Sequence, residues 1–217
     1  MTVAPTLGPV GVHQVGDDAD LREAIAALGA GGVVAIPTDT VYGLAVDPSH
    51  PRAIDALFSL KRRPQDVDLP VLVAGVDQAE RLVEPPGLSA QAQRIVTAFW
   101  PGPLTIVVPR RHDLHWALGP RNTTIGLRCP RHTIAQRLCE VVGPLAVTSA
   151  NVHGEPPCTD AHAVRVLFGA SVAVVVDGGG GCGGIPSTVV DVTGRHIRCL
   201  REGALLWHQV ATVAGNA

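Results

Sequence analysis

The sequence predicts a layered α/β domain with a mixed sheet and helices on both faces of that sheet. Helical and extended patterns alternate along the chain, which is typical of α/β architecture. Several predicted strands are continuous apolar runs rather than alternating patterns, so both of their faces are expected to be covered. A chain of 217 residues is also long enough to bury one ordinary core without disulfides or metal.

The N-terminal part begins with a helix, a strand and a second helix. The first helix starts near Asp18, repeats its apolar residues at helical spacing and ends at the glycines in 29–32. The apolar run 33–36 predicts a short buried strand, which a proline stops. The second helix starts near Pro51 and ends by Arg63, because the next residue is a proline.

The rest of the chain continues the alternation of strands and helices. Strands are predicted at residues 69–74, 104–109, 124–128, 145–148, 172–177, 188–192 and 197–200. Helices are predicted at residues 89–99, 132–142, 160–168 and 204–213. No internal repeat divides the chain, so a single domain is expected.

Charge and hydropathy indicate a protein that neither coats nucleic acid nor enters a membrane. The chain has 17 Lys and Arg against 19 Asp and Glu, whereas nucleic-acid coating scales with the number of phosphates neutralised. Its apolar runs are shorter than the roughly 20 residues of a membrane helix. Residues 1–11 have no positive cluster before an apolar stretch, so we expect a cytoplasmic protein.

The cysteines and histidines do not predict a metal site. The five cysteines contain no C-x-x-C pair, and isolated pairs such as Cys129 with His132 are weak evidence for a metal site. We interpret all five thiols as small buried hydrophobic groups. The cysteines are Cys129, Cys139, Cys158, Cys182 and Cys199.

Lys61 is the single lysine among 17 basic residues. A chain that uses arginine almost everywhere else suggests that this position needs a compact ammonium group rather than a planar guanidinium. If the chain is extended here, Lys61 and Arg63 point the same way and could bind one polyphosphate. Capping of the preceding helix is the simpler explanation of the positive charge.

Four predicted strand ends are unusually polar, and ligands of open α/β sheets bind beyond strand ends. These are residues 38–44, residues 148–151, the strand 124–128 with Arg128 at its end, and the Ser187-Thr188 pair. Each has a local explanation in turns and caps, but four in one small domain favour a ligand site.

Familiar phosphate-binding and hydrolase motifs are absent from the sequence. No glycine-rich loop runs into Gly-Lys-Ser/Thr, and no helix pattern of the dinucleotide type follows the GGGGCGG run at 178–184. We interpret that run as a flap or a linker. No G-x-S-x-G, H-E-x-x-H or paired-carboxylate pattern is present either.

Five segments together resemble the YrdC/Sua5 family in order and spacing. They are PTDTVYGL at 37–44, KRRP at 61–64, WPGPLT at 100–105, TSAN at 148–151 and PSTVVD at 186–191. The resemblance runs from about Asp18 to Gly203. It implies a strongly twisted mixed open sheet of the YrdC/RibB type, a catalytic domain over 1–203 and a short C-terminal helix or tail over 204–217.

The resemblance also implies an activity. Family members are nucleotidyltransferases that join L-threonine, bicarbonate and ATP, with Mg2+, into threonylcarbamoyl-adenylate and pyrophosphate. A separate transferase then moves the threonylcarbamoyl group to adenosine 37 of tRNA. Weak binding of this chain to tRNA or double-stranded RNA is left open.

The resemblance assigns roles to residues that match the family's motifs. Lys61 and Arg63 correspond to the pair on the ATP phosphates and are the expected catalytic residues. The remaining nucleotide contacts correspond to Thr124, Asn151, Thr159 and Arg201, and the threonine contacts to Thr38, Arg128, Ser149 and Ser187. Residues 100–105 are expected to build the fold.

Two positions depart from the family pattern, and both put local loop geometry in doubt. Asp68 stands where the family usually has proline, and Glu202 replaces the proline of the usual Arg-Pro-Gly. Neither departure removes an expected ligand residue. No general base is evident.

Two other functions are still open at the level of sequence. One is carbamoyl-adenylate formation, as in the hydrogenase-maturation carbamoyltransferases, although those proteins are much larger. The other is an RNA-binding factor without catalysis, which the acidic balance of charge weakens. RNA binding would fall steeply with salt and survive Lys61→Ala, whereas a nucleotide site would lose ATP binding.

Overall fold

The computed structural model describes residues 11–13, 18–61, 68–120, 123–179 and 182–215. The strands in these ranges are β1 (Gly11–His13), β2 (Val34–Ile36), β3 (Gly43–Val46), β4 (Val71–Leu72), β5 (Leu104–Pro109), β6 (Thr124–Arg128), β7 (Leu145–Ser149), β8 (Val174–Val176), β9 (Thr188–Asp191) and β10 (Arg198–Arg201). The helices are α1 (Asp18–Gly29), α2 (Pro51–Leu60), α3 (Val76–Glu80), α4 (Ala90–Phe99), α5 (Thr133–Val141), α6 (Ala161–Phe168) and α7 (Trp207–Ala214), with a 3-10 turn at Gly169–Ser171.

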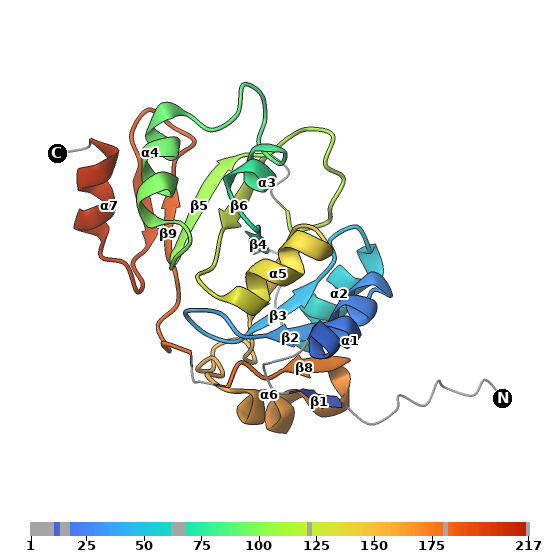
Figure 1. The fold of residues 1–217 in the computed structure, drawn as a ribbon. Coiled ribbons are helices and arrows are strands. Elements are labelled where there is room, and N and C mark those ends of the chain that lie inside the picture. The colour runs from blue at the N-terminus through green and yellow to red at the C-terminus, as the bar shows by residue number, and fades with distance from the viewer. Residues whose placement is uncertain (1–10, 14–17, 62–67, 121–122, 180–181, 216–217) are drawn as a thin grey trace.

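All the described strands join one mixed sheet in the order β1-β8-β2-β3-β7-β4-β6-β5-β9-β10. The pairs β1–β8, β8–β2, β4–β6 and β5–β9 are parallel, and the other pairs are antiparallel. The sheet is strongly twisted: β5 and β6 run up and down the view of Figure 1, whereas β2, β3 and β8 run across it. The mixed, twisted sheet confirms the predicted fold class.

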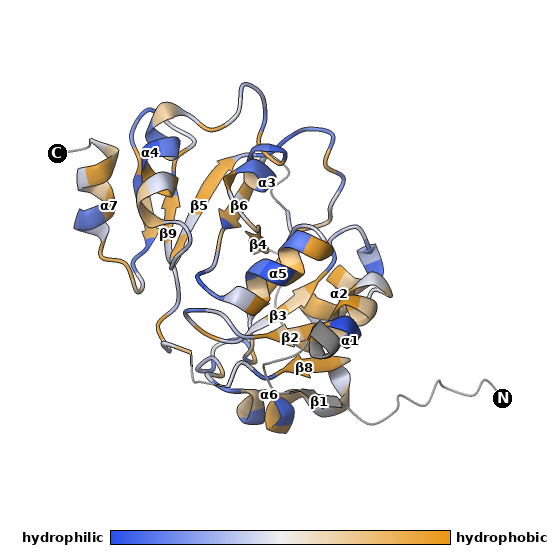
Figure 2. Ribbon diagram, viewed as in Figure 1, coloured by the Kyte–Doolittle hydropathy of each residue, from blue (hydrophilic) through white to orange (hydrophobic). Residues whose placement is uncertain are grey.

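Alternate side chains of β2, β3, β4, β7 and β8 enter two different cores. On β2, Val34 and Ile36 belong to the core that contains residues of α1 and α5, whereas Ala35 belongs to a second core that contains residues of α2, α4, α6 and α7. The helices in Figure 2 accordingly turn apolar sides toward the apolar strands and polar sides outward. Helices on both faces are therefore confirmed, and they explain why the strands read as continuous apolar runs.

The helical cover on the α1 and α5 face does not extend over the whole sheet. The core beneath α1 and α5 contains residues of β2, β3, β4, β7 and β8, but none of the described residues of β5, β6 or β9. The register places six residues on this face, of which Thr105 and Arg128 are buried and the others are half-buried: Thr105, Val107, Thr124, Gly126, Arg128 and Val189. We refer to these six residues as the open face.

Most predicted elements are confirmed, and three were missed. The strands 104–109 and 124–128 have the predicted bounds, and α2 ends at Leu60, before the predicted limit. The prediction missed β3, which pairs with β2 as a hairpin and begins inside the segment 38–44 that we interpreted as a polar strand end. It also missed β1 and α3, which are three and five residues long.

The C-terminal helix α7 packs against α4, beside which it stands in Figure 1. Gln91 Nε2 and Arg94 Nη2, both on α4, donate to the Ala214 carbonyl at 3.1 and 3.0 Å. The residues after 203 therefore contribute a layer to the core through Val210 and Ala214.

The thiols differ from the sequence interpretation at two positions. Cys129, Cys139 and Cys158 are buried as predicted, but Cys182 and Cys199 are half-buried, so the prediction is wrong for these two. Cys182 follows the glycine run, and Cys199 is on the edge strand β10, where only one neighbouring strand covers it. Within the described ranges, no helix has the length and apolarity that crossing a bilayer would require.

Candidate active site

Lys61 is the buried cation at the centre of the candidate site. It is the C-cap of α2 and is 3% exposed, and its backbone N–H donates to Leu57 O. The ammonium Nζ donates to Ser149 O at 2.7 Å, to Ser149 Oγ at 3.1 Å and to Asn151 Oδ1 at 2.6 Å. The structure therefore brings Lys61 together with two residues predicted from a distant motif.

Ser149 and Asn151 hold each other as well as Lys61. Ser149 ends β7, and its Oγ donates to Asn151 Oδ1 at 2.7 Å. Asn151 Nδ2 donates to the Glu155 carbonyl, and the His153 backbone N–H donates to the Lys61 carbonyl at 3.1 Å. The loop after β7 thus wraps around the end of α2 and fixes the three side chains relative to one another.

The polypeptide at Lys61 is not extended, contrary to one expectation from the sequence. Its backbone has φ of −80° and ψ of −8°, the conformation of a last helical turn. We expected the side chains of Lys61 and Arg63 to point the same way because alternate residues of an extended chain do so. Lys61 is not extended, so this expectation is wrong for Lys61. Arg62 and Arg63 lie outside the described residues, so the role of Arg63 stays a prediction.

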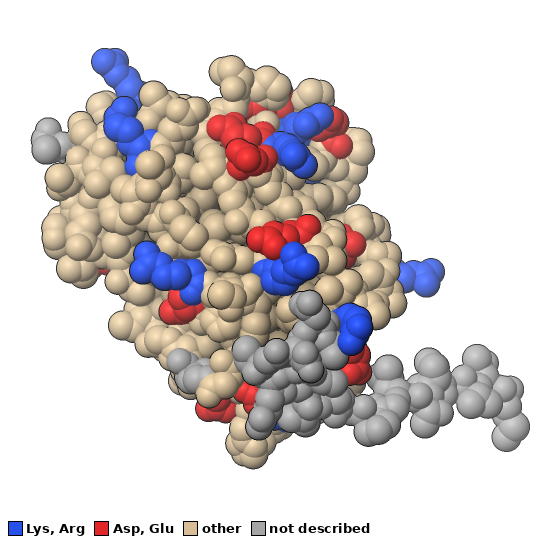
Figure 3. Space-filling model, in the orientation of Figure 1, with Lys and Arg blue, Asp and Glu red and all other residues tan. Residues whose placement is uncertain are grey.

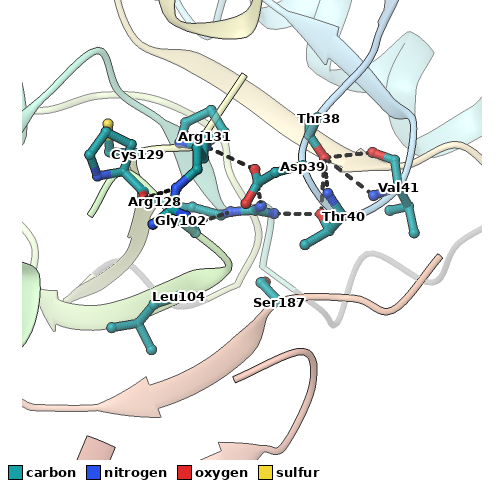
Figure 4. Close-up of polar contacts among 12 residues, drawn as sticks. Thr38, Asp39, Thr40, Val41, Gly102, Leu104, Arg128, Cys129, Arg131 and Ser187 are labelled. Atoms are coloured by element: carbon teal, nitrogen blue, oxygen red, sulfur yellow. Dashed lines mark hydrogen bonds and ion pairs between the residues drawn. The ribbon is translucent and has the colours of Figure 1, made fainter. Parts of the chain in front are cut away.

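Arg128 forms a second cationic centre at the end of β6 (Figure 4). Its Nε donates to Gly102 O at 3.1 Å, Nη1 to Thr40 Oγ1 at 2.8 Å and Nη2 to Asp39 Oδ1 at 2.6 Å. Burial lowers the pKa of Arg128, and the Asp39 carboxylate opposes that effect. The guanidinium is thereby held in one orientation.

The loop between β2 and β3 continues this network through two hydroxyls. Thr40 Oγ1 and Thr38 Oγ1 lie 2.9 Å apart, and Thr38 Oγ1 donates to Val41 O at 2.7 Å. Because a guanidinium cannot accept and a carbonyl cannot donate, the hydroxyl protons must run from Thr40 to Thr38 and from Thr38 to Val41. The predicted site residue Thr38 is therefore buried and bonded within its own loop.

A third cluster lies at the start of β9. Ser187 Oγ is 2.9 Å from Thr105 Oγ1, and Arg201 donates to Ser187 O through Nε at 3.1 Å and Nη2 at 2.8 Å. Register places Thr105 across from Arg128 on the open face. The charge of Arg201 also lowers the pKa of Arg128, after the larger effect of burial. Hydrogen bonds therefore join the predicted residues Ser187 and Arg201, and the charge of Arg201 acts on Arg128.

Thr124 and Thr159 lie at the margins of these clusters. Thr124 is the first residue of β6 and shares the open face with Arg128, but it is at the opposite end of the strand. Thr159 is half-buried, and its carbonyl accepts from the Cys182 backbone N–H at 2.8 Å. The structure therefore brings neither side chain into the hydrogen-bonded clusters.

The described ends of the glycine run are tied to the site loops. Gly178 N–H donates to the Tyr42 hydroxyl at 3.0 Å, and Gly184 N–H donates to Thr40 O at 2.6 Å. At Gly178 an added Cβ would lie 2.7 Å from Pro37 Cβ, so the glycine permits a close approach. Residues 180 and 181 lie outside the described part of the chain, and the flap or linker interpretation stays a prediction.

The two departures from the family pattern have local partners. Glu202 Oε2 accepts from the Trp207 backbone N–H at 2.9 Å, at the start of α7. Asp68 lies beside Gly119 and near Arg110, whose pKa is lowered by burial and raised in part by the Asp68 charge. Glu202 therefore bonds the start of α7, and Asp68 lies against the segment that contains Gly119.

Sequence reasoning missed four residues of the network: Asp39, Thr40, Gly102 and Thr105. Asp39 and Thr40 belong to the polar run after β2, so this segment gave a signal, although it could not separate one residue from another. Gly102 and Thr105 belong to a segment expected to build the fold. It does so through Trp100 Nε1, which donates to Leu104 O at 2.8 Å, but it also contributes a carbonyl and a hydroxyl to the site.

Two further observations concern metal binding and nucleic-acid binding. Among the described residues, no group of three His, Cys, Asp or Glu side chains could hold a metal ion. On the face seen in Figure 3, basic and acidic side chains are intermixed, and no broad area of its described residues is basic alone. That face does not resemble a nucleic-acid-coating surface.

Comparison with known proteins settles the family. The model of the Sua5/YciO/YrdC family, described as telomere recombination, matches residues 26–203. The chain belongs to this family. A Vibrio cholerae member named threonylcarbamoyl-AMP synthase is 36% identical over 186 residues, which cover 85% of this chain and 97% of that protein. A Mycobacterium tuberculosis member, which carries the same name provisionally, is 42% identical over 192 residues, 88% of each chain.

A solved Sua5/YciO/YrdC structure shows the same fold. Pyrococcus abyssi Sua5 in complex with L-threonine superposes with a TM-score of 0.84 and 33% sequence identity. The match covers 94% of this chain and 59% of the Sua5 chain. The present chain therefore spans about three fifths of that protein.

Proposed function

We propose that this chain is a threonylcarbamoyl-AMP synthase, which converts L-threonine, bicarbonate and ATP into threonylcarbamoyl-AMP and pyrophosphate. The observation that carries the proposal is the buried ammonium of Lys61 bonded to Ser149 and Asn151. Lys61 belongs to one family motif, and Ser149 and Asn151, which follow it by 88 and 90 residues, belong to another. Relatives that match most of the chain and are named for this activity support the same conclusion.

The nucleotide half of the proposal rests on Lys61. Its buried ammonium is held by oxygens of Ser149 and Asn151, and a fixed cation suits phosphate groups, which are the anions that transfer reactions must stabilise. We assign Lys61 and Arg63 to the triphosphate, and Thr124, Asn151, Thr159 and Arg201 to the rest of ATP. Thr124 lies on the uncovered face beside β5, where a flat base could rest without displacing a helix.

The threonine half of the proposal rests on Arg128, Ser187 and Thr38, with Ser149 between the two halves. A fixed guanidinium suits a carboxylate, because two parallel N–H groups can bind its two oxygens. Thr38 is bonded within its own loop, so we assign it to the wall of the pocket. L-Threonine is bound in the related P. abyssi Sua5, which is consistent with this assignment.

Magnesium would enter with the nucleotide. Mg2+ usually keeps several waters and binds through substrate phosphates and one or two carboxylates. We therefore assign the ion mainly to ATP oxygens. When bound, Mg2+ supplies further positive charge against the phosphates.

The reaction can be written with its atoms balanced. The neutral amine of threonine and bicarbonate give an N-carboxylate and water. An oxygen of that carboxylate attacks the α-phosphorus of ATP, and the bond from this phosphorus to the α,β-bridging oxygen breaks. Pyrophosphate leaves with the electron pair, and Lys61 and Arg63 lower the cost of the negative charge that gathers there. A reactant held in line against fixed cations gains much of its rate from orientation.

The pathway context is part of the same proposal. The product would pass to a separate tRNA threonylcarbamoyltransferase that modifies adenosine 37, and the chain would act in the cytoplasm. Weak contact with tRNA or double-stranded RNA would be secondary to catalysis, since the chain carries 17 basic and 19 acidic residues.

The decisive experiment measures pyrophosphate release with ATP, bicarbonate and one amino acid at a time. Threonine should outperform serine, and release should require bicarbonate. Equal rates with serine, or release that continues in bicarbonate-free buffer, would contradict the substrate assignment. Mass spectrometry of the nucleotide product identifies threonylcarbamoyl-AMP directly.

A further inference from the structure

Asp39 occupies a half-buried junction that no family-derived role explains. Its side chain is 15% exposed, and a single oxygen, Oδ1, accepts two hydrogen bonds. One comes from Arg128 Nη2 at 2.6 Å and the other from the backbone N–H of Arg131 at 2.9 Å. Figure 4 shows the carboxylate between these two partners, with Thr40 beside the same guanidinium.

The two bonds tie together three separate parts of the chain. Asp39 lies in the loop after β2, Arg128 ends β6, and Arg131 precedes α5. Asp39 is 89 and 92 residues away from its two partners in sequence. The carboxylate therefore controls both the position of the guanidinium and the start of the helix that covers the adjacent half of the sheet.

Arg128 has more N–H groups than its bonds to Asp39, Thr40 and Gly102 use. A guanidinium has five N–H groups. Three are used, by the Gly102 carbonyl, the Thr40 hydroxyl and Asp39. One N–H on each terminal nitrogen is left without a partner among the described residues. Two donors on neighbouring nitrogens form the set that binds a carboxylate through both of its oxygens.

The charge balance around Arg128 favours an added anion. Arg201 is close enough to lower the pKa of Arg128 and bonds Ser187, whereas Asp39 is the carboxylate that pairs with Arg128. The two guanidinium groups together carry more charge than the one carboxylate, while the paired Asp39 offsets part of the cost of burying Arg128. The Asp39 carboxylate thus orients Arg128, and the two remaining N–H groups can bind an anion.

We propose that Asp39 is a positioning residue for threonine recognition: it fixes Arg128 so that its two remaining donors meet the substrate carboxylate. This inference rests on the proposed function and adds to it a residue that acts through Arg128 rather than on the substrate. Its effect should therefore be confined to threonine and leave ATP recognition at Lys61 unchanged.

The test compares Asp39→Asn and Asp39→Ala with wild type in pyrophosphate release and in threonine binding by calorimetry. Asparagine keeps an oxygen that can accept both hydrogen bonds but loses the charge, and alanine loses both. The loss of a charged hydrogen bond corresponds to about a tenfold or larger effect. We expect the KM for threonine to rise about tenfold or more in Asp39→Ala and by less in Asp39→Asn, with the KM for ATP within about twofold of wild type. Asp55→Asn, an exposed carboxylate change on α2, is the matched control and should match wild type.

Three results would overturn the inference. Equal increases in both KM values, with lowered thermal stability, would mean that Asp39 has a structural role alone. Unchanged threonine binding would mean that Arg128 is positioned without it. A fall in the KM for threonine would mean that Asp39 competes with the substrate carboxylate for Arg128. Wild-type protein that makes no threonylcarbamoyl-AMP would instead contradict the proposed function, so the two failures are distinguishable.

Discussion

Lys61 and Asn151 are joined by a 2.6 Å hydrogen bond from the ammonium to the side-chain carbonyl oxygen, although 90 residues separate them in the chain. Ser149 adds a carbonyl and a hydroxyl oxygen to the same ammonium. These three acceptors hold the ammonium in one orientation. A buried cation oriented in this way is suited to an incoming polyphosphate, so its removal should impair the use of ATP.

Lys61→Met should abolish most of the activity. Removal of one charge-stabilising group from an active site commonly costs about 100- to 1,000-fold in rate, and we expect a loss of that order in kcat/KM for ATP. The oxygens of Ser149 and Asn151 would lose their donor, so the free energy of unfolding should fall by about 1–3 kcal/mol. Steady-state kinetics and chemical denaturation measure the two effects.

The matched control for this change is Arg52→Met on the same helix. Arg52 is exposed, and its substitution should leave both quantities near wild type. Lys61→Arg keeps a charge but replaces the compact ammonium with a planar guanidinium, and it should still lose at least about tenfold in rate. Full activity in Lys61→Arg would contradict the interpretation that the site requires a lysine.

Asn151→Asp should weaken ATP binding for the opposite reason. The new carboxylate would lie about where Oδ1 lies, 2.6 Å from the ammonium in the present structure, and would pair with the lysine charge. ATP would then have to displace an internal anion, so we expect the Kd for ATP to rise about tenfold or more. Equilibrium dialysis or calorimetry measures the Kd. Tighter ATP binding in this variant would show that the Lys61 charge does not face the phosphates.

The sequence predicted the architecture well because continuous apolar runs correspond to buried strands. The strands 104–109 and 124–128 are bounded correctly, since prolines and polar residues stop their apolar patterns. β3 was missed because Gly43 opens it. An added Cβ at Gly43 would lie 2.6 Å from Val147 Cγ1, so this glycine allows β7 to pack closely rather than marking a turn. Tertiary packing of this kind leaves no local signature in sequence.

The site was predicted less completely than the fold. The clustering of Lys61 with Ser149 and Asn151 followed from the family resemblance, because spacing alone could not bring together residues 90 positions apart. Asp39 and Thr105 were missed because their importance lies in which side chains they contact across the sheet. The partners of a carboxylate or a hydroxyl depend on strand register, and register requires the three-dimensional structure.

Gly203→Ala should impair both stability and threonine binding. An added Cβ would lie 2.2 Å from the Pro186 carbonyl oxygen and 2.7 Å from the Ser187 carbonyl oxygen. Both are backbone atoms that cannot turn aside, so the segment carrying Ser187 must shift. We expect a loss of about 1–3 kcal/mol in the free energy of unfolding and a higher KM for threonine.

Gly194→Ala is the matched control for Gly203→Ala. Its added Cβ would meet the His196 carbonyl oxygen at 3.7 Å, which is ordinary contact, so both properties should remain near wild type. Denaturation curves and threonine titrations test the pair together. If Gly203→Ala bound threonine normally, the Ser187 segment would not be part of the amino-acid pocket.

Tyr42 should make the stability of the protein fall in alkaline solution. Its hydroxyl donates to Val176 O at 3.1 Å and accepts from Gly178 N at 3.0 Å, and burial raises its pKa from 10.0 to about 12. Between these pH values the folded chain keeps a proton that the unfolded chain releases. The free energy of unfolding should therefore decline as pH rises through this window, by roughly 2–3 kcal/mol in all.

The chain has one tyrosine, so the ultraviolet absorbance of tyrosinate reports this group alone. Tyr42→Phe should lack both the absorbance change and this part of the pH dependence, and a folded-state transition near pH 10 would refute the prediction.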